Sequence, residues 1–198
     1  MDKVKKALMR VQYNSPVILT YTLISALALA LGKLTGNWTT THLFSVYSGS
    51  LLDPLFYLRL VGHIFGHADF SHFFNNFIII LLAGPMLEER YGAKRMVYMC
   101  LVTALITGVF HAITADTALL GASGVGFMMI LLCSFVNLER GRVPMTLILC
   151  IIVFIGREVV DGVAQTDNIS QLTHIIGGVC GASFGFLVNY DKLRKRRP

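Results

Sequence analysis

Charged residues are scarce in this chain of 198 residues: only 14% are charged, whereas 55% belong to the apolar set AVILMFWYC. A soluble globular domain has about 25% charged and about 45–50% apolar residues, so this composition excludes an ordinary soluble protein and a disordered one. We therefore expect one all-α, polytopic membrane domain over 1–198, with short basic tails at 1–12 and 191–198. The length allows about six spans of about 20 residues each.

Cysteine is also sparse, and its spacing shows no pairing. Each of the four cysteines lies inside an apolar run, as expected of small buried hydrophobic residues rather than of a disulfide framework or a metal site. This excludes the class of small disulfide-stabilised secreted domains. The four positions are Cys100, Cys133, Cys150 and Cys180.

Basic residues are unevenly distributed between the apolar runs, which lie at about 16–31, 70–87, 96–113, 123–138, 143–156 and 172–190. All 17 Lys and Arg except Lys33, Arg59 and Arg157 fall on one side of the predicted membrane. By the positive-inside rule, we expect an integral membrane protein with both termini cytoplasmic. As a separate expectation, the membrane is a bacterial inner membrane. The charge is then a topology signal and requires no nucleic-acid partner.

Asp and Glu are missing from the apolar parts of the six runs, whereas His, Asn and Ser occur there. His72 and Asn76 open the second run, Ser123 opens the fourth and His174 opens the sixth. Counted at about 1.5 Å per residue from the next charged residue, His72, Ser123 and His174 lie at a similar depth of about 24–26 Å. Polar side chains in hydrocarbon usually face a cavity or a partner, so we predict one site built by three helices.

The residue types at this depth suit acyl transfer. A serine becomes nucleophilic when a neutral imidazole takes its proton, so Ser123 and His174 form a candidate dyad. Asn76, His72 and the Ser123 backbone N–H are candidate oxyanion donors. No carboxylate is available in the spans for a triad, and the chemistry requires no cofactor.

Glycines favour close packing of the predicted fourth and sixth helices. A glycine at every fourth position leaves a smooth helix face for a neighbouring backbone. Phe127 lies one turn after Ser123 and is expected to stack on His174. The glycines are Gly177, Gly181 and Gly185 on the sixth run, with Gly124 and Gly126 as the matching surface on the fourth.

Four ordered motifs resemble those of the rhomboid family of intramembrane serine proteases, over about 59–185. The family often has Trp-Arg in its first outer loop, where this chain has Leu58-Arg59. The matching motifs are GxSG at Gly121-Ala122-Ser123-Gly124, His-xx-Gly-xxx-Gly at His174, Gly177 and Gly181, His-xxxx-His-xxx-Asn at His67, His72 and Asn76, and Glu-x-Arg at Glu88 and Arg90.

The resemblance implies a bundle of six transmembrane helices whose first outer loop, 32–69, is embedded in the membrane. It also implies an outward-open cavity with Ser123 as nucleophile, His174 as general base, and Asn76, His72 and the Ser123 N–H around the oxyanion. The expected partners are the lipid bilayer and single-pass transmembrane proteins, cleaved within or near their membrane segment.

Other interpretations remain open at this point. One is a non-catalytic relative that binds membrane-protein clients, and another is a channel or transporter, which would need charged residues deep in several spans. A third is a zinc site formed by His63, His67 and His72, although structural hydrogen bonds explain these histidines better. His42 and His111 are interpreted as interfacial, and Asn75 as facing away from the site.

Overall fold

The computed structural model describes residues 13–136 and 168–194, together with positions 145, 148, 149, 152, 153 and 156 between them. The described residues are mostly helical and form no strand; a single β-bridge among them joins Val46 to Leu119. The predicted all-α class is confirmed. In chain order the elements are α2 (Pro16–Leu34), α3 (Trp38–Leu43), α4 (Pro54–Gly62), the 3-10 helix η1 (His63–Phe65), α5 (Phe70–Tyr91), α6 (Ala93–Thr114), α7 (Ser123–Ser134) and α9 (Asn168–Arg194).

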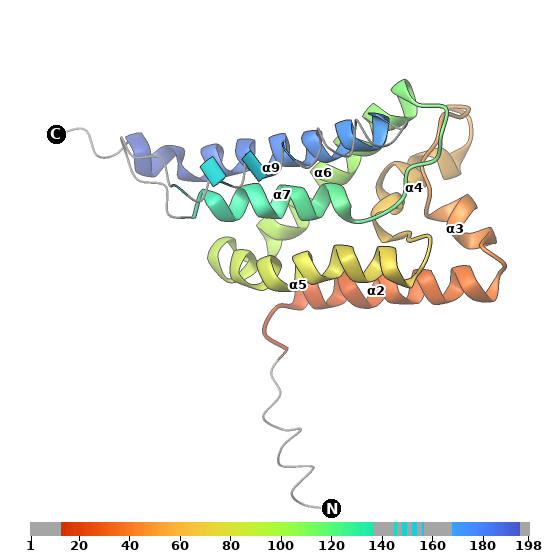
Figure 1. Ribbon diagram of the computed structural model, residues 1–198, viewed down its shortest axis with the longest axis horizontal. Helices are drawn as coiled ribbons and strands as arrows, with labels where there is room; N and C mark the ends of the chain where they lie inside the picture. Colours follow the sequence, from red (N-terminus) through yellow and green to blue (C-terminus); the bar gives the residue numbers. More distant parts are fainter. Residues whose placement is uncertain are drawn as a thin grey trace, which may run out of the picture.

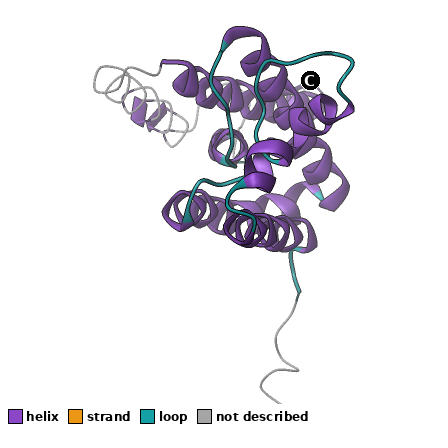
Figure 2. Ribbon diagram, turned by 90° about the vertical axis from the view of Figure 1, so that its right-hand side faces the viewer, coloured by secondary structure: helices purple, strands orange, loops and turns teal. Residues whose placement is uncertain are grey.

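Among the described helices, four are long and apolar enough to cross a membrane: α2, α5, α6 and the part of α9 over Leu172–Tyr190. Helices α2, α5 and α9 run along roughly one direction while α6 passes obliquely behind, and α2 begins at the same end of the bundle at which α9 finishes (Figure 1). Figure 2 looks from the opposite end, where α3, α4 and the longer loops lie. The fifth predicted span, 143–156, lies almost wholly outside the described residues.

Capping groups, rather than the limits of the apolar runs, decide where these helices begin and end. The Asp69 carboxylate accepts the His72 N–H at 2.8 Å and starts α5. Gly92, with φ +85°, separates α5 from α6. Because backbone bonding continues into polar flanks, α5 and α6 extend beyond the predicted 70–87 and 96–113. In contrast, α7 ends at Ser134 and is shorter than the predicted 123–138.

Helices α7 and α9 approach each other at backbone distance. A Cβ on Gly177 would overlap the Gly124 carbonyl, and one on Gly181 would overlap the Met128 carbonyl. Only glycine at these two positions of α9 allows this approach, as small residues do between membrane helices. The pair forms the upper layer of the bundle in Figure 1.

Gly126 takes no part in this contact, contrary to the expectation from the sequence. The nearest atom to a Cβ built there is Ile79 Cγ2 on α5, at 3.9 Å. Two residues along a helix correspond to about 200° of rotation, so Gly124 and Gly126 lie on nearly opposite faces of α7. Gly124 therefore serves the α9 contact, and Gly126 faces α5.

A buried carboxylate joins the start of α2 to the end of α5. Glu88 is 5% exposed and accepts the backbone N–H groups of Val17 and Ile18, both at 3.1 Å. The first N–H groups of a helix have no partner within it, and their partial positive charge favours a carboxylate. Glu88 therefore acts as an N-terminal cap supplied by another helix.

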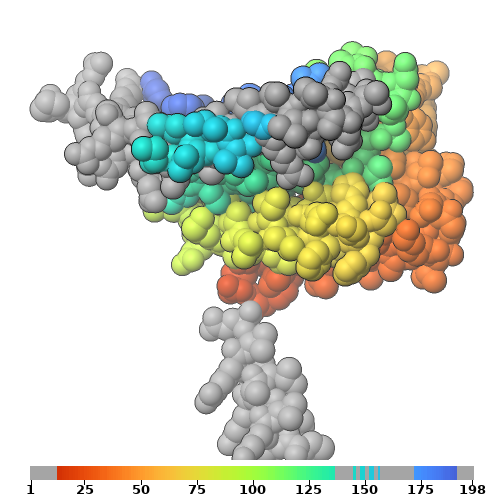
Figure 3. Space-filling view, in the orientation of Figure 1, coloured from red at the N-terminus to blue at the C-terminus, as the bar shows by residue number. Residues whose placement is uncertain are grey.

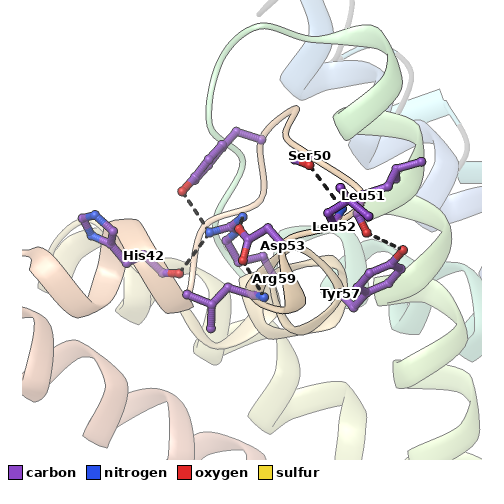
Figure 4. A network of polar contacts seen from close by, with 9 residues as sticks. His42, Ser50, Leu51, Leu52, Asp53, Tyr57 and Arg59 are labelled. Carbon is purple, nitrogen blue, oxygen red and sulfur yellow. Dashed lines mark hydrogen bonds and ion pairs between the residues drawn. The ribbon is translucent and has the colours of Figure 1, made fainter.

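A buried arginine holds the segment 32–69, where the family that the sequence resembles often has a Trp-Arg pair. Arg59 is 4% exposed, forms an ion pair with Asp53 at 2.6 Å and donates to the Tyr47 hydroxyl at 3.0 Å (Figure 4). Its guanidinium also lies 4.5 Å from the centre of the Tyr47 ring. The Leu55 N–H and Arg59 hold the pKa of Asp53 below its ordinary value. Leu58 is 53% exposed, and Arg59 anchors the segment without a tryptophan beside it.

Candidate active site

The two residues expected to form a dyad are in hydrogen-bond contact. His174 Nε2 lies 2.9 Å from Ser123 Oγ, although the residues are 51 positions apart in the chain. Ser123 is the first residue of α7 and His174 lies near the start of α9; both side chains are half-buried. This distance is typical of a hydroxyl bonded to an imidazole.

The close approach of α7 and α9 explains this contact. Gly124 follows Ser123 directly, and Gly177 lies one turn after His174, so the backbones meet beside the two side chains. The Phe127 ring lies 4.8 Å from the His174 ring at an angle of 41°. The predicted ring contact exists, although it is tilted rather than stacked, and it packs one face of the imidazole.

A cavity of about 270 Å³ opens beside the serine and contains the predicted oxyanion donors. Asn76 Nδ2 is buried and has no hydrogen-bond partner among the described residues. A buried donor without a partner costs free energy unless a ligand supplies the acceptor. The lining residues are His72, Asn75, Asn76, Ile79, Leu119, Leu120, Ser123, Gly126, Phe127 and His174.

Because Gly121 has no side chain, the His72 and Asn76 side chains can lie close to the turn before Ser123. Its φ is +122°, which L side chains rarely adopt, and a Cβ there would lie 2.7 Å from His72 Nε2 and 3.4 Å from Asn76 Nδ2. The glycine of the GxSG motif is thus required both by the backbone conformation and by the space that these two side chains occupy.

Two histidines that precede α5 bind the backbone of the turn before Ser123. Gly121 N–H donates to the His63 carbonyl at 3.0 Å, and Ala122 N–H donates to His67 Nε2 at 3.4 Å. His67 Nδ1 donates to the Phe65 carbonyl at 3.2 Å, which assigns the proton to Nδ1 and leaves Nε2 as the acceptor. Burial lowers the pKa of His67 to about 4, so the ring is neutral near pH 7.

The histidines do not form the zinc site considered from the sequence. His63 Nδ1 bonds to the Arg59 carbonyl at 3.3 Å, and its Nε2 lies 3.4 Å from Thr107 Oγ1. His67 is occupied by the Phe65 and Ala122 backbone groups. Within the described ranges, no group of three or more His, Cys, Asp or Glu residues is placed to hold a metal ion.

One side chain differs from its interpretation in the sequence. Asn75 is exposed and lines the cavity, rather than facing away from it. His111 is 2% exposed, and its Nε2 donates to the Thr117 carbonyl at 2.9 Å near the end of α6. A helical-wheel comparison of Asn75 with His72, Asn76 and Ile79 would have placed it beside the site. His42 is exposed, and its ring stacks 4.7 Å from Trp38.

The arrangement combines a hydroxyl, an imidazole in contact with it, and side-chain donors across a small cavity. None of the described residues that line the cavity is acidic. These groups are sufficient for nucleophilic attack on an acyl carbon and for binding the oxyanion that results.

The chain is similar to known proteins of one family. A family model described as the Rhomboid domain matches residues 54–191. The chain is 30% identical to the Rhomboid-related protein 1 of Caenorhabditis elegans, over 70% of this chain and 42% of that protein. It is 26% identical to the Rhomboid-like protease 1 of Toxoplasma gondii, over 67% of this chain and 47% of that protein. The chain therefore spans less than half the length of these curated relatives.

Proposed function

Because the chain belongs to the rhomboid family and is an integral membrane protein, we propose that it is an intramembrane serine endopeptidase with a Ser123–His174 dyad. The observation that carries the proposal is the distance of 2.9 Å between Ser123 Oγ and His174 Nε2. A hydroxyl in contact with an imidazole beside a cavity is the arrangement that acyl transfer requires.

In the proposed reaction, Ser123 Oγ attacks the carbonyl carbon of the scissile peptide bond while His174 Nε2 takes the hydroxyl proton. The Ser123 N–H, the Asn76 amide and the His72 ring donate to the developing oxyanion. His174 then gives its proton to the leaving amine, and the C–N bond breaks to leave an acyl-enzyme. Water attacks this ester with His174 again as base, which releases the new carboxyl end and restores Ser123.

The proposed substrates are single-pass transmembrane proteins, because the cavity lies among helices that cross the membrane. A helical segment shields its own peptide bonds, so the residues around the scissile bond must unwind before Ser123 can reach it. Helix-destabilising residues in the substrate therefore favour cleavage.

The experiment is covalent labelling of the detergent-solubilised protein with a fluorophosphonate probe, combined with cleavage of a model single-pass substrate. We expect the wild type to be labelled and to cleave, and Ser123→Ala and His174→Ala to lose both activities. A matched control is Ser134→Ala on the same helix, because the Ser134 hydroxyl bonds to the Ile130 carbonyl away from the cavity.

The outcomes separate the two functions considered for this family. A folded wild type that is neither labelled nor cleaves any model substrate contradicts the protease and favours a client-binding protein. Labelling that persists in Ser123→Ala shows that a different residue is the nucleophile.

A further inference from the structure

Asn75 is an amide on the boundary between the lipid-facing side of α5 and the cavity. It is exposed and lines the cavity, yet it has no role in the dyad or among the oxyanion donors. At about 100° per residue, Asn75 lies about 60° from Ile78 and about 40° from Ile79 around the helix axis. Ile78 is 42% exposed on the outer face of α5, whereas Ile79 lines the cavity.

Apolar side chains lie beside Asn75 on the outer side of α5, whereas the polar Ser71 and His72 lie about one turn before it. Phe74 precedes it and is 51% exposed, and Leu82 follows two turns later at 78%. Figure 3 shows that α5, in yellow, lies on the visible face of the molecule below α7. An amide among such residues is costly next to hydrocarbon, so polar groups at these positions usually serve a function.

The Asn75 side chain makes no hydrogen bond with any residue that the structure describes. An Asn side chain offers two N–H donors and one carbonyl acceptor, which together match a peptide group. Asn75 differs from Asn76 in position: Asn76 is more deeply buried, and its Nδ2 lies near the turn that precedes Ser123.

A substrate that moves from the bilayer into the cavity crosses this boundary. The residues near its scissile bond must lose their helical hydrogen bonds before attack, and their N–H and C=O groups then lack water as a partner. A neutral side chain with both a donor and an acceptor can satisfy either group, whichever residues the substrate contains.

Resting on the proposed function, we propose that Asn75 is a substrate-binding residue whose amide pairs with the main chain of the unwound transmembrane segment at the mouth of the cavity. The ligand class is an extended peptide backbone, so the contact favours segments that unwind easily without selecting particular side chains. Asn75 binds the substrate and leaves the chemistry to Ser123 and His174.

The test compares Asn75→Leu and Asn75→Gln with the wild type in the full chain. Three quantities are measured: KM and kcat for a model single-pass substrate, the rate of fluorophosphonate labelling, and the thermal unfolding midpoint. Losing one or two hydrogen bonds predicts a rise of about 3- to 10-fold in KM for Asn75→Leu. The kcat and the labelling rate stay within twofold of the wild type, because the small probe does not reach across the boundary.

Asn75→Gln, which keeps the amide, is expected to recover most of the affinity. Thr114→Leu is the matched control, since it also replaces an exposed polar residue with leucine but lies at the end of α6, outside the cavity lining. We expect its KM to equal that of the wild type.

Three results would overturn the inference. An unchanged KM in Asn75→Leu shows that the amide does not bind substrate. A fall in kcat and in labelling together shows that Asn75 shapes the catalytic site instead. If the wild type is neither labelled nor cleaves substrate, the proposed function fails and the inference fails with it. The first two results contradict only the inference and leave the proposed function intact.

Discussion

At the scale of the residue, the site depends on which polar atoms have partners and which do not. Ser123 Oγ and His174 Nε2 satisfy each other, whereas buried Asn76 Nδ2 has no partner among the described residues. A donor left in this way keeps its full hydrogen-bonding capacity for a charge that develops nearby. In the proposed reaction, this free donor would face the oxyanion, which forms only transiently.

We predict that Asn76→Ala and His72→Ala each lower kcat/KM for a model substrate by about 10²–10³-fold, the usual loss for one oxyanion donor. The thermal unfolding midpoint serves as the control, because neither side chain lies in the hydrophobic core. Full activity in either variant would contradict the assignment of that donor.

His67 gives a second prediction, in which pH controls stability. Its pKa is lowered to about 4 by burial, whereas an unfolded histidine titrates near 6.5. Between these values the unfolded state binds more protons, so the free energy of unfolding falls as the pH drops from about 6.5 toward 4. Protonation of Nε2 would also break its bond from the Ala122 N–H.

The measurement is unfolding of the purified protein in detergent at a series of pH values. We expect His67→Gln to reduce the slope between pH 5 and 6 by about 1 kcal/mol per pH unit, since one titrating group is removed. An unchanged slope in this variant would show that His67 does not carry the effect.

At the scale of the element, the contact between α7 and α9 determines the distance between the two dyad residues. We predict that Gly177→Ala destabilises the fold by about 1–3 kcal/mol, because its Cβ meets the Gly124 carbonyl and must push the helices apart. A misplacement of about 1 Å between reacting groups costs about 100-fold in rate, and we expect a loss of that order in cleavage.

Gly181→Ala provides the comparison one turn further from the site. Its Cβ meets the Met128 carbonyl, so a similar loss of stability is expected with a smaller loss of activity. Ser183→Ala, at an exposed position of α9, is the control for an alanine on this helix. Wild-type cleavage by Gly177→Ala would show that the glycine contact does not set the dyad distance.

The elements also show what the sequence could predict. The long spans and the meeting of Ser123 with His174 follow from apolar runs and depth, because both depend on about 1.5 Å of rise per residue. Helix ends depend instead on caps such as Asp69 and Gly92, which an apolar window does not detect. The helix faces on which Asn75 and Gly126 lie depend on rotation about the helix axis. The predicted helices were therefore in the right part of the chain, but the predicted face of each of these two residues was wrong.

At the scale of the whole molecule, the described helices place the start of α2, the α5–α6 turn and the end of α9 at one end of the bundle (Figure 1). The basic residues of that turn, Lys94 and Arg95, are exposed, and positive charge favours the cytoplasmic side. We therefore predict that this end of the bundle faces the cytoplasm, and cysteine labelling can test it.

We expect Lys94→Cys, in cells that produce the protein, to react with a membrane-impermeant maleimide only after the membrane is permeabilised. Ser50→Cys, in the exposed loop at the opposite end, is expected to react in intact cells. Reaction of Lys94→Cys in intact cells would reverse the orientation. The unsubstituted protein is the control for its own cysteines, of which Cys100 and Cys180 are buried.

The cap that Glu88 places on α2 has a consequence for biosynthesis. Val17 is synthesised 71 residues before Glu88. At about 5–20 residues per second, roughly 4–14 s pass between the synthesis of Val17 and that of the carboxylate that caps α2. During that interval the Val17 and Ile18 N–H groups depend on water at the membrane surface, while Pro16 has no N–H to satisfy. The first helix thus reaches its final hydrogen bonding only when the second span has been inserted, which links the two segments in the order of assembly.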